Sequence, residues 1–138
     1  MKNLLLINQS LTILFLSPTY AGKVHDKRMA DAAPYPLPPQ SCLLQDLGFV
    51  GFSLDGVIHE TPHKKPKGGE LTADQKAENH ALAQRRVRIE HVNSSVKRCR
   101  IVKETIRLLK KGLRDVVMEI SCALHNFRVR LQPWMPMA

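Results

Sequence analysis

The sequence predicts a mixed α/β fold in which short strands precede long helices. Three observations support this prediction. Short apolar runs broken by proline and glycine occupy residues 1–60, a basic loop follows at 61–71, and residues 72–131 repeat apolar side chains at helical spacing. With 138 residues, the chain has room for one domain with a moderate core. We therefore expect one domain that is β-rich first and helical afterwards.

Two apolar runs at residues 4–7 and 11–16 flank the polar sequence Asn8-Gln9-Ser10. This pattern is typical of a β-hairpin whose strands are buried on both faces, although a single helix has the same apolar content. Residues 25–32 suit a short helix. The four prolines that come next exclude regular structure up to Ser41.

A compact apolar run, Cys42-Leu43-Leu44, predicts one further strand, which ends at Gln45 and Asp46. Gly48 and Gly51 follow. A buried strand that ends in an acid before a glycine-rich turn is a common way to present a carboxylate at a sheet edge. An aspartate that caps this turn is an equally good interpretation. Residues 56–59 are a weaker candidate for another strand.

The helical part begins with its clearest signal, a capping box formed by Thr72 and Gln75. Apolar residues then recur at helical spacing from Leu82 to Val96, so one stripe of this helix is expected to face a core. A second, shorter helix is predicted around residues 106–109 and ends at Gly112. A third helix follows with an equally regular apolar pattern, made of Leu113, Val116, Val117, Ile120, Ala123, Leu124, Phe127 and Leu131.

Charge limits the class of partner. Lysine and arginine number 21 against 12 acids, which gives a formal net charge of +9. Such a balance favours nucleic acid or an acidic membrane face. Lys64, Lys65 and Lys67 are most simply a solvated charge run, but in a protein that processes DNA they are candidate phosphate contacts.

The N-terminus imitates a secretory signal, because Lys2 and two apolar runs precede Thr19-Tyr20-Ala21. One hypothesis is therefore a small secreted basic protein whose mature chain begins at Gly22. Polar residues interrupt the would-be apolar core, and the segment is too short and too polar for a transmembrane helix.

Cysteines and histidines provide no metal or disulfide pattern. Cys42, Cys99 and Cys122 are odd in number and widely spaced, which favours free thiols in a reducing compartment. The six histidines lack the close helical spacing that a zinc site favours, so solvated or packed histidines are the better interpretation.

Glu90 lies beside the apolar Ile89 and among arginines on the long predicted helix. The simplest interpretation is an exposed acid paired with Arg86 one turn earlier, since such pairs are common. The functional interpretation is a metal-binding carboxylate at the edge of a DNA-binding face.

Three stretches resemble the DDE superfamily endonucleases, the transposases of a large group of bacterial insertion sequences. They are SPTYAGKVHDKRMAD at 17–31, LPPQSCLLQDLGFVGF at 37–52 and KKPKGGELTADQKAEN at 64–79, the last continued by RVRIEH at 86–91 and VKRCRI at 96–101. The resemblance covers nearly the whole chain in order. Its most specific part is KPKGGELT with the downstream Ile-Glu-His.

The resemblance implies an RNase H-like fold with three metal-binding acids and a pair of divalent ions, Mg²⁺ or Mn²⁺, about 4 Å apart. Such enzymes hydrolyse and then join DNA phosphodiester bonds. The acid of the Asp-x-Gly-Phe-x-Gly element falls on Asp46, and the glutamate before histidine falls on Glu90. Both are thereby implied as catalytic and metal-binding residues, and a supporting role is implied for His91. The residues implied to hold the DNA backbone are Lys64, Lys65, Lys67, Arg85, Arg86, Arg88, Lys97 and Arg98.

The chain departs from the family at its beginning. The first acid of the family lies on a strand upstream of the hairpin, and Asp26, Asp31 and Asp55 stand in the wrong elements to replace it. We therefore expect a single partial, incomplete RNase H-like domain that is inactive alone. It would associate with DNA, and with a second copy or a complementary upstream fragment, but with no membrane.

The resemblance also changes the interpretation of the N-terminus. Residues 2–20 match core strands of the family, so secretion is not expected and the location is the bacterial cytoplasm. The leading hypothesis is a fragment of a DDE transposase. The alternative is a non-catalytic basic DNA-binding protein whose long helix docks on phosphate backbones.

Overall fold

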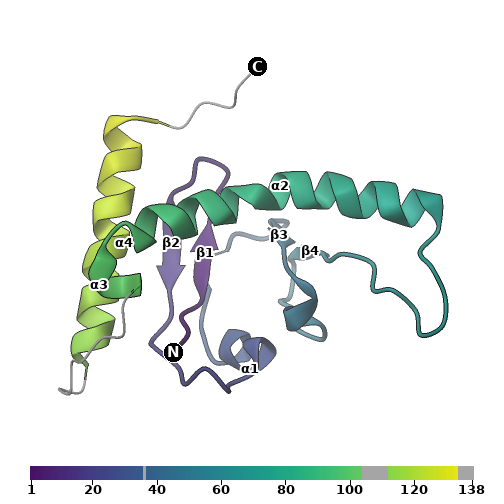
Figure 1. Ribbon diagram of the computed structural model, residues 1–138, viewed down its shortest axis with the longest axis horizontal. Coiled ribbons are helices and arrows are strands. Elements are labelled where there is room, and N and C mark those ends of the chain that lie inside the picture. The colour runs from purple at the N-terminus through teal and green to yellow at the C-terminus, as the bar shows by residue number, and fades with distance from the viewer. Residues whose placement is uncertain (36, 104–111, 134–138) are drawn as a thin grey trace. The chain divides into compact units, whose positions relative to one another are not determined.

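The computed structural model describes residues 1–35, 37–103 and 112–133. The chain forms two compact units: a hairpin unit, Met1–Gly22 with Arg88–Ala138, and a parallel-strand unit, Lys23–Val87. The long helix α2, Ala73–Lys97, contributes to both units, since the division falls within it (Figure 1). None of the helices in the described ranges has the length and apolar content needed to cross a membrane.

In the hairpin unit, β1 (Leu5–Ile7) pairs antiparallel with β2 (Ile13–Leu16), which confirms the predicted hairpin. The turn is stabilised by Asn8, whose Oδ1 accepts hydrogen bonds from the N–H groups of Ser10 and Thr12, each at 3.0 Å. A short polar side chain that bonds the backbone just ahead of it is a common turn former.

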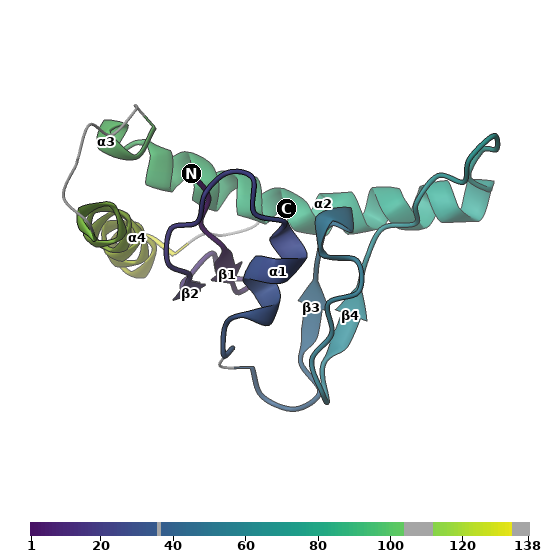
Figure 2. The ribbon, with the colours of Figure 1, turned by 90° about the horizontal axis from the view of Figure 1, so that it is seen from below.

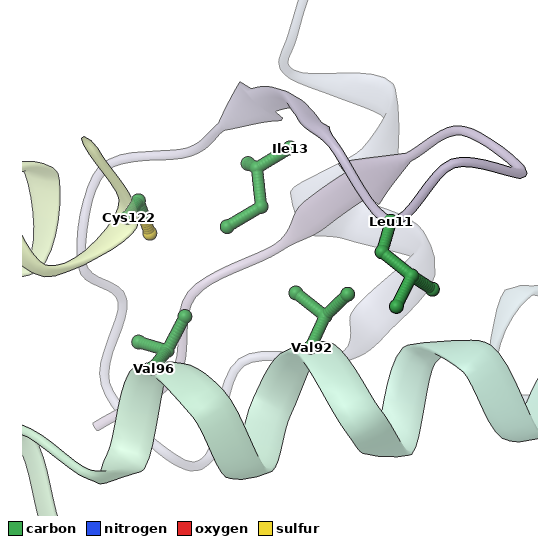
Figure 3. Packing of buried hydrophobic residues seen from close by; sticks show 5 residues of the cluster. All are labelled: Leu11, Ile13, Val92, Val96 and Cys122. Atoms are coloured by element: carbon green, nitrogen blue, oxygen red, sulfur yellow. The ribbon is translucent and has the colours of Figure 1, made fainter. Parts of the chain in front are cut away.

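The core of this unit lies between the hairpin and two helices, α2 and α4 (Leu113–Leu131). Figure 3 shows its buried members: Leu11 and Ile13 from the hairpin, Val92 and Val96 from α2, and Cys122 from α4. The predicted apolar stripe of α2 is thus confirmed at its C-terminal end. The expectation that both faces of the hairpin are buried is wrong, because Leu14 is exposed. The reason is that this core meets the hairpin on one face.

Polar side chains of α4 also attach it to the N-terminal segment. His125 is buried, and its Nε2–H donates to the Leu11 carbonyl at 2.7 Å. The Thr19 N–H donates to Asp115 Oδ1 at 2.8 Å, and the hydrogen bonds from Thr19 hold the pKa of that carboxyl below its usual value. These bonds turn a partly polar face of α4 towards the hairpin.

The apolar stripe predicted on the third helix therefore does not form the core. The helix exists as α4, but its buried residues are Ser121, Cys122 and His125. The large apolar side chains on the stripe are exposed, namely Val116, Ile120, Leu124, Phe127 and Leu131.

The region between α2 and α4 contains a short helix, α3 (Arg100–Lys103). The second helix predicted around Ile106, Leu108 and Leu109 falls outside the described residues. Gly112 is the N-cap of α4, with φ at 84° in the left-handed region that glycine adopts at no steric cost.

In the parallel-strand unit, β3 (Cys42–Leu44) pairs in parallel with β4 (Ile58–Glu60) (Figure 2). The strand predicted at residues 42–44 is confirmed as β3. The weaker strand candidate at residues 56–59 corresponds to β4. The expected burial of β3 is wrong, because Cys42 is exposed. The predicted short helix is α1 (Asp26–Asp31), which is capped by His25 and buries Met29 and Ala30.

Helix α2 begins where the capping box predicted. The Gln75 N–H donates to Thr72 Oγ1 at 3.2 Å, and the Thr72 N–H donates to Gln75 Oε1 at 3.1 Å. Two donors that a helix terminus leaves unpaired are satisfied in this way.

Candidate functional site

Two acids lie at one edge of the parallel strand pair. Parallel strands end at the same edge, so the residues that follow β3 and those that end β4 are neighbours. Leu44 is the register partner of Glu60, and the Gln45 N–H donates to the Glu60 carbonyl at 3.0 Å. Asp46 comes next in the chain. The parallel pairing therefore brings Asp46 and Glu60 to the same end of the sheet.

A side-chain network fixes the loop that presents Asp46. Gln45 is buried, and its Oε1 accepts from His59 Nδ1–H at 3.0 Å. His59 Nε2 in turn accepts from the Leu54 N–H at 3.0 Å. Since Nε2 is an acceptor here, His59 is the neutral tautomer with its proton on Nδ1. The Phe52 and His59 rings pack nearly perpendicular to each other, with centroids 5.8 Å apart.

Asp46 caps the 3₁₀ helix η1 (Leu47–Phe49) and is exposed. Its Oδ1 accepts from the Leu47 N–H at 2.7 Å, and its Oδ2 forms an ion pair with Arg86 Nη2 at 3.0 Å. The capping interpretation is thus confirmed. The second carboxylate oxygen faces a cation from α2.

Close contacts and backbone conformation explain why glycine occupies two positions of the Asp-x-Gly-Phe-x-Gly element. A Cβ at Gly48 would lie 2.7 Å from Asp26 Oδ2, which is closer than real Cβ contacts allow. Gly51 has φ at +87°, and a Cβ there would lie 3.1 Å from Lys27 Cε. The turn therefore favours glycine at position 51, whereas a side chain at position 48 would require the Asp26 carboxylate to move.

Glu60 forms the second part of the edge. Arg85 Nη1 pairs with its Oε2 at 2.5 Å, and the Cys42 thiol donates to its Oε1 at 3.0 Å. The hydrogen bond to Glu60, followed by partial burial, raises the pKa of the Cys42 thiol. The same bond, with Arg85, lowers the pKa of Glu60. Sequence reasoning missed Glu60, although a strand that ends in an acid is the signal that identified Asp46.

Glu90 lies on α2 one turn after Arg86 and is exposed. Its simplest interpretation, a pair with Arg86, is wrong, because that guanidinium pairs with Asp46. In the described ranges, no ion pair of Glu90 is found. His91, which follows it, is exposed.

The eight predicted phosphate contacts differ in exposure and in their partners. Three of them already pair with acids: Lys65 with Glu70 at 2.6 Å, Arg85 with Glu60, and Arg86 with Asp46. Four others are exposed: Lys64, Lys67, Lys97 and Arg98. Arg88 is half-buried and has a partner.

The start of the basic loop is fastened to α2. Asn79 Oδ1 accepts from the His63 N–H at 2.7 Å, its Nδ2 donates to the His63 carbonyl at 3.1 Å, and the His63 ring pairs with Glu78 at 2.6 Å. An open groove of about 390 Å³ lies beside these residues and is also lined by Glu60 and Arg85. The start of the basic loop is therefore held against α2, close to Glu60 and Arg85.

The acids at this edge of the β3–β4 pair can be compared with the ligands that a metal ion requires. Mg²⁺ prefers several carboxylate oxygens. Across the part of the chain that the structure describes, no three or more His, Cys, Asp or Glu side chains are grouped to hold a metal ion. The described acids therefore do not form a complete ligand set.

Comparisons with known proteins show the family of this chain. A family model described as DDE superfamily endonuclease matches residues 1–126. A probable transposase for insertion sequence element IS702, from Microchaete diplosiphon, is 28% identical over 134 residues, which cover 96% of this chain. The chain spans only 48% of that relative's length. No solved structure matches the chain significantly. Because the family model covers most of its residues, the chain belongs to the DDE superfamily endonucleases.

Proposed function

We propose that this chain is one part of the RNase H-like catalytic domain of a DDE transposase, which cleaves and joins DNA phosphodiester bonds. The observation that best supports the proposal is the setting of Asp46. Its carboxylate is exposed, is oriented by a backbone cap, and follows a strand in the element that the family uses for an acid. Glu90, the acid before His91, would be a second metal-binding residue.

The divalent metal of the family needs more donors than the described residues bring together. Asp46 Oδ2 would have to exchange Arg86 for the ion. We propose that a further acid comes from a complementary segment, supplied by an upstream fragment or another chain. When bound, two such ions would stabilise the attacking and leaving oxygens of the phosphodiester.

DNA would be held through its phosphates. Four of the predicted contacts are exposed and would give up only bound water on contact with a phosphate. They are Lys64, Lys67, Lys97 and Arg98. Lys65, Arg85 and Arg86 would exchange a carboxylate for a phosphate. Exposed ion pairs are worth only about 0–1 kcal/mol, so this exchange costs little.

Metal binding tests the two acids directly. Mn²⁺ titration followed by electron paramagnetic resonance should show weak binding, with a Kd on the order of 10⁻³ M. Asp46→Asn and Glu90→Gln should each weaken it severalfold. Asp74→Asn is the matched control, because Asp74 is an exposed acid at the start of α2 to which the family resemblance assigns no metal. Equal Mn²⁺ binding by all four proteins would remove both acids from the proposed site.

DNA binding tests the partner. Fluorescence anisotropy with duplex DNA should show an affinity that falls steeply with salt, and Lys67→Gln should flatten the slope of log K against log salt by about 1. Lys23→Gln, another exposed lysine, should leave the slope unchanged. A chain that binds no DNA at 50 mM salt would contradict the proposal.

Plasmid nicking separates the proposal from its alternative. The chain alone should not nick supercoiled DNA with Mg²⁺ or Mn²⁺, whereas addition of a segment that bears the missing acid should produce nicking that Asp46→Asn abolishes. A non-catalytic DNA-binding protein would bind DNA equally with and without metal, and no added segment would make it nick.

A further inference from the structure

A stripe of exposed apolar side chains on α4 has no part in the proposed function. Ile120 is 54% exposed, Phe127 60% and Leu131 66%. With Val116 and Leu124 they form one continuous stripe, because they recur at three- and four-residue spacing on a helix. Contiguous exposed apolar patches of this kind mark interaction surfaces.

The stripe is symmetric about the midpoint between Ala123 and Leu124. Val116 and Leu131 are equally far from that midpoint, and so are Ile120 and Phe127. If a second α4 lies antiparallel on the first, each apolar residue therefore meets an apolar residue. A surface that matches itself in this way is the requirement for a two-fold symmetric dimer.

The charges beside the stripe are complementary in the same arrangement. Glu119 and Arg130 are eleven residues apart, which is about three helical turns, so they share one flank of the stripe. In an antiparallel pair, the same flanks of both helices meet. Glu119 of one copy would then lie about 3 Å along the axis from Arg130 of the other, and this contact would occur twice.

Both charged residues are available for such a contact. Glu119 and Arg130 are exposed, and within the described ranges neither takes part in an ion pair. We propose that α4 is a homodimer interface, in which two copies of this chain pair antiparallel through the Val116–Leu131 stripe and two Glu119–Arg130 contacts. The inference does not depend on the proposed function, because α4 contains none of the proposed site residues.

The interface is one helix per copy, so the dimer should be weak, with a Kd on the order of 10 μM. Sedimentation velocity of the full chain between 1 and 200 μM should show a reversible monomer–dimer equilibrium. Phe127→Glu should raise the Kd more than tenfold. Val50→Glu, which charges an exposed apolar residue of the parallel-strand unit, is the matched control and should leave the Kd unchanged.

Charge reversal tests the geometry rather than the hydrophobicity. Glu119→Arg alone and Arg130→Glu alone should each raise the Kd about tenfold, because each turns two attractions into repulsions. The double reversal should restore it to within about threefold. Circular dichroism melts of these surface variants should match the parent.

The proposal fails if the chain stays monomeric up to 200 μM, as it would if another polypeptide covers the stripe. It also fails if Phe127→Glu leaves the dimer intact, or if the double reversal is no tighter than the single variants.

Discussion

The side-chain amide of Asn126 hydrogen-bonds both backbone groups of Ile13. Its Oδ1 accepts from the Ile13 N–H at 2.8 Å, and its Nδ2 donates to the Ile13 carbonyl at 2.9 Å. A side chain of α4 thereby occupies the position that a neighbouring strand would take at this point of β2. Unpaired strand edges invite association with other chains, so Asn126 protects this part of the hairpin as well as anchoring it.

Replacement of Asn126 by alanine should lower the free energy of unfolding by about 2 kcal/mol, because two part-buried backbone groups lose their partners. Urea denaturation measures this change. Asn93→Ala, on α2, is the control that shares the gain in helix propensity, about 0.5 kcal/mol, without these bonds. Equal stability of the two variants would show that the Asn126 bonds contribute nothing.

Asp46 should respond differently to asparagine and to alanine. Asparagine keeps an acceptor for the Leu47 N–H, so Asp46→Asn should lose only the exposed pair with Arg86, worth less than about 1 kcal/mol. Asp46→Ala should cost about 1 kcal/mol more. Thermal denaturation of both variants, repeated in Arg86→Gln, measures the cap and the pair separately. A loss in Asp46→Asn as large as in Asp46→Ala would contradict this assignment.

A methyl group at Gly48 should displace the carboxylate of Asp26. Gly48→Ala should cost about 1 kcal/mol, because its Cβ would lie 2.7 Å from Asp26 Oδ2 and the carboxylate at the end of that side chain would have to rotate away. Asp26→Ala in the same chain should recover at least half of that loss, which a double-mutant cycle measures. Gly22→Ala, whose Cβ would have ordinary contacts only, should change stability by less than about 0.5 kcal/mol. Strict additivity of the Gly48 and Asp26 changes would refute the steric explanation.

Because Cys122 is buried, its contribution to the free energy of unfolding should decrease as the pH rises in the alkaline range. Desolvation, with a smaller effect of Cys99, raises the pKa of the Cys122 thiol to about 11 from an ordinary value of 9.0. Below pH 9 the thiol is protonated in both the folded and the unfolded chain, so its contribution is complete. Between pH 9 and 11 the unfolded chain loses the proton and the folded chain keeps it, so stability falls by up to about 2–3 kcal/mol.

Comparison with Cys122→Ala isolates this effect, because other titrations cancel in the difference. Urea denaturation of both proteins at pH 8, 9, 10 and 10.5 should show the parent losing its advantage progressively above pH 9. A stability difference that stays constant over this range would contradict a raised pKa.

Local signals in the sequence were reliable where neighbours in the chain decide the structure. The capping box at Thr72, the short helix after His25 and the hairpin around Asn8 are all present. Each depends on hydrogen bonds between residues a few positions apart. Such patterns can be read without knowledge of the rest of the fold.

The candidate site was predicted only in part. Asp46 was identified by its place after a strand, and the structure confirms its exposure and its cap. Glu60 was missed, and Arg86 was assigned to Glu90 rather than to Asp46. These pairings depend on which strands lie together and in which direction, and spacing along the chain does not contain that information. The joint role of Asp46 and Glu90 stays a prediction.

The sequence by itself determined the family, the order of strands before helices and the positive charge. It also predicted Asp46 and Glu90 as residues of the site. Only the tertiary structure decided which face of α4 is buried. The apolar stripe was as regular as that of α2, yet the hairpin bonds His125 and Asn126 on another face. The physical reason is that periodicity fixes which side chains share a face, whereas the partner that covers a face is set by contacts between residues far apart in the chain.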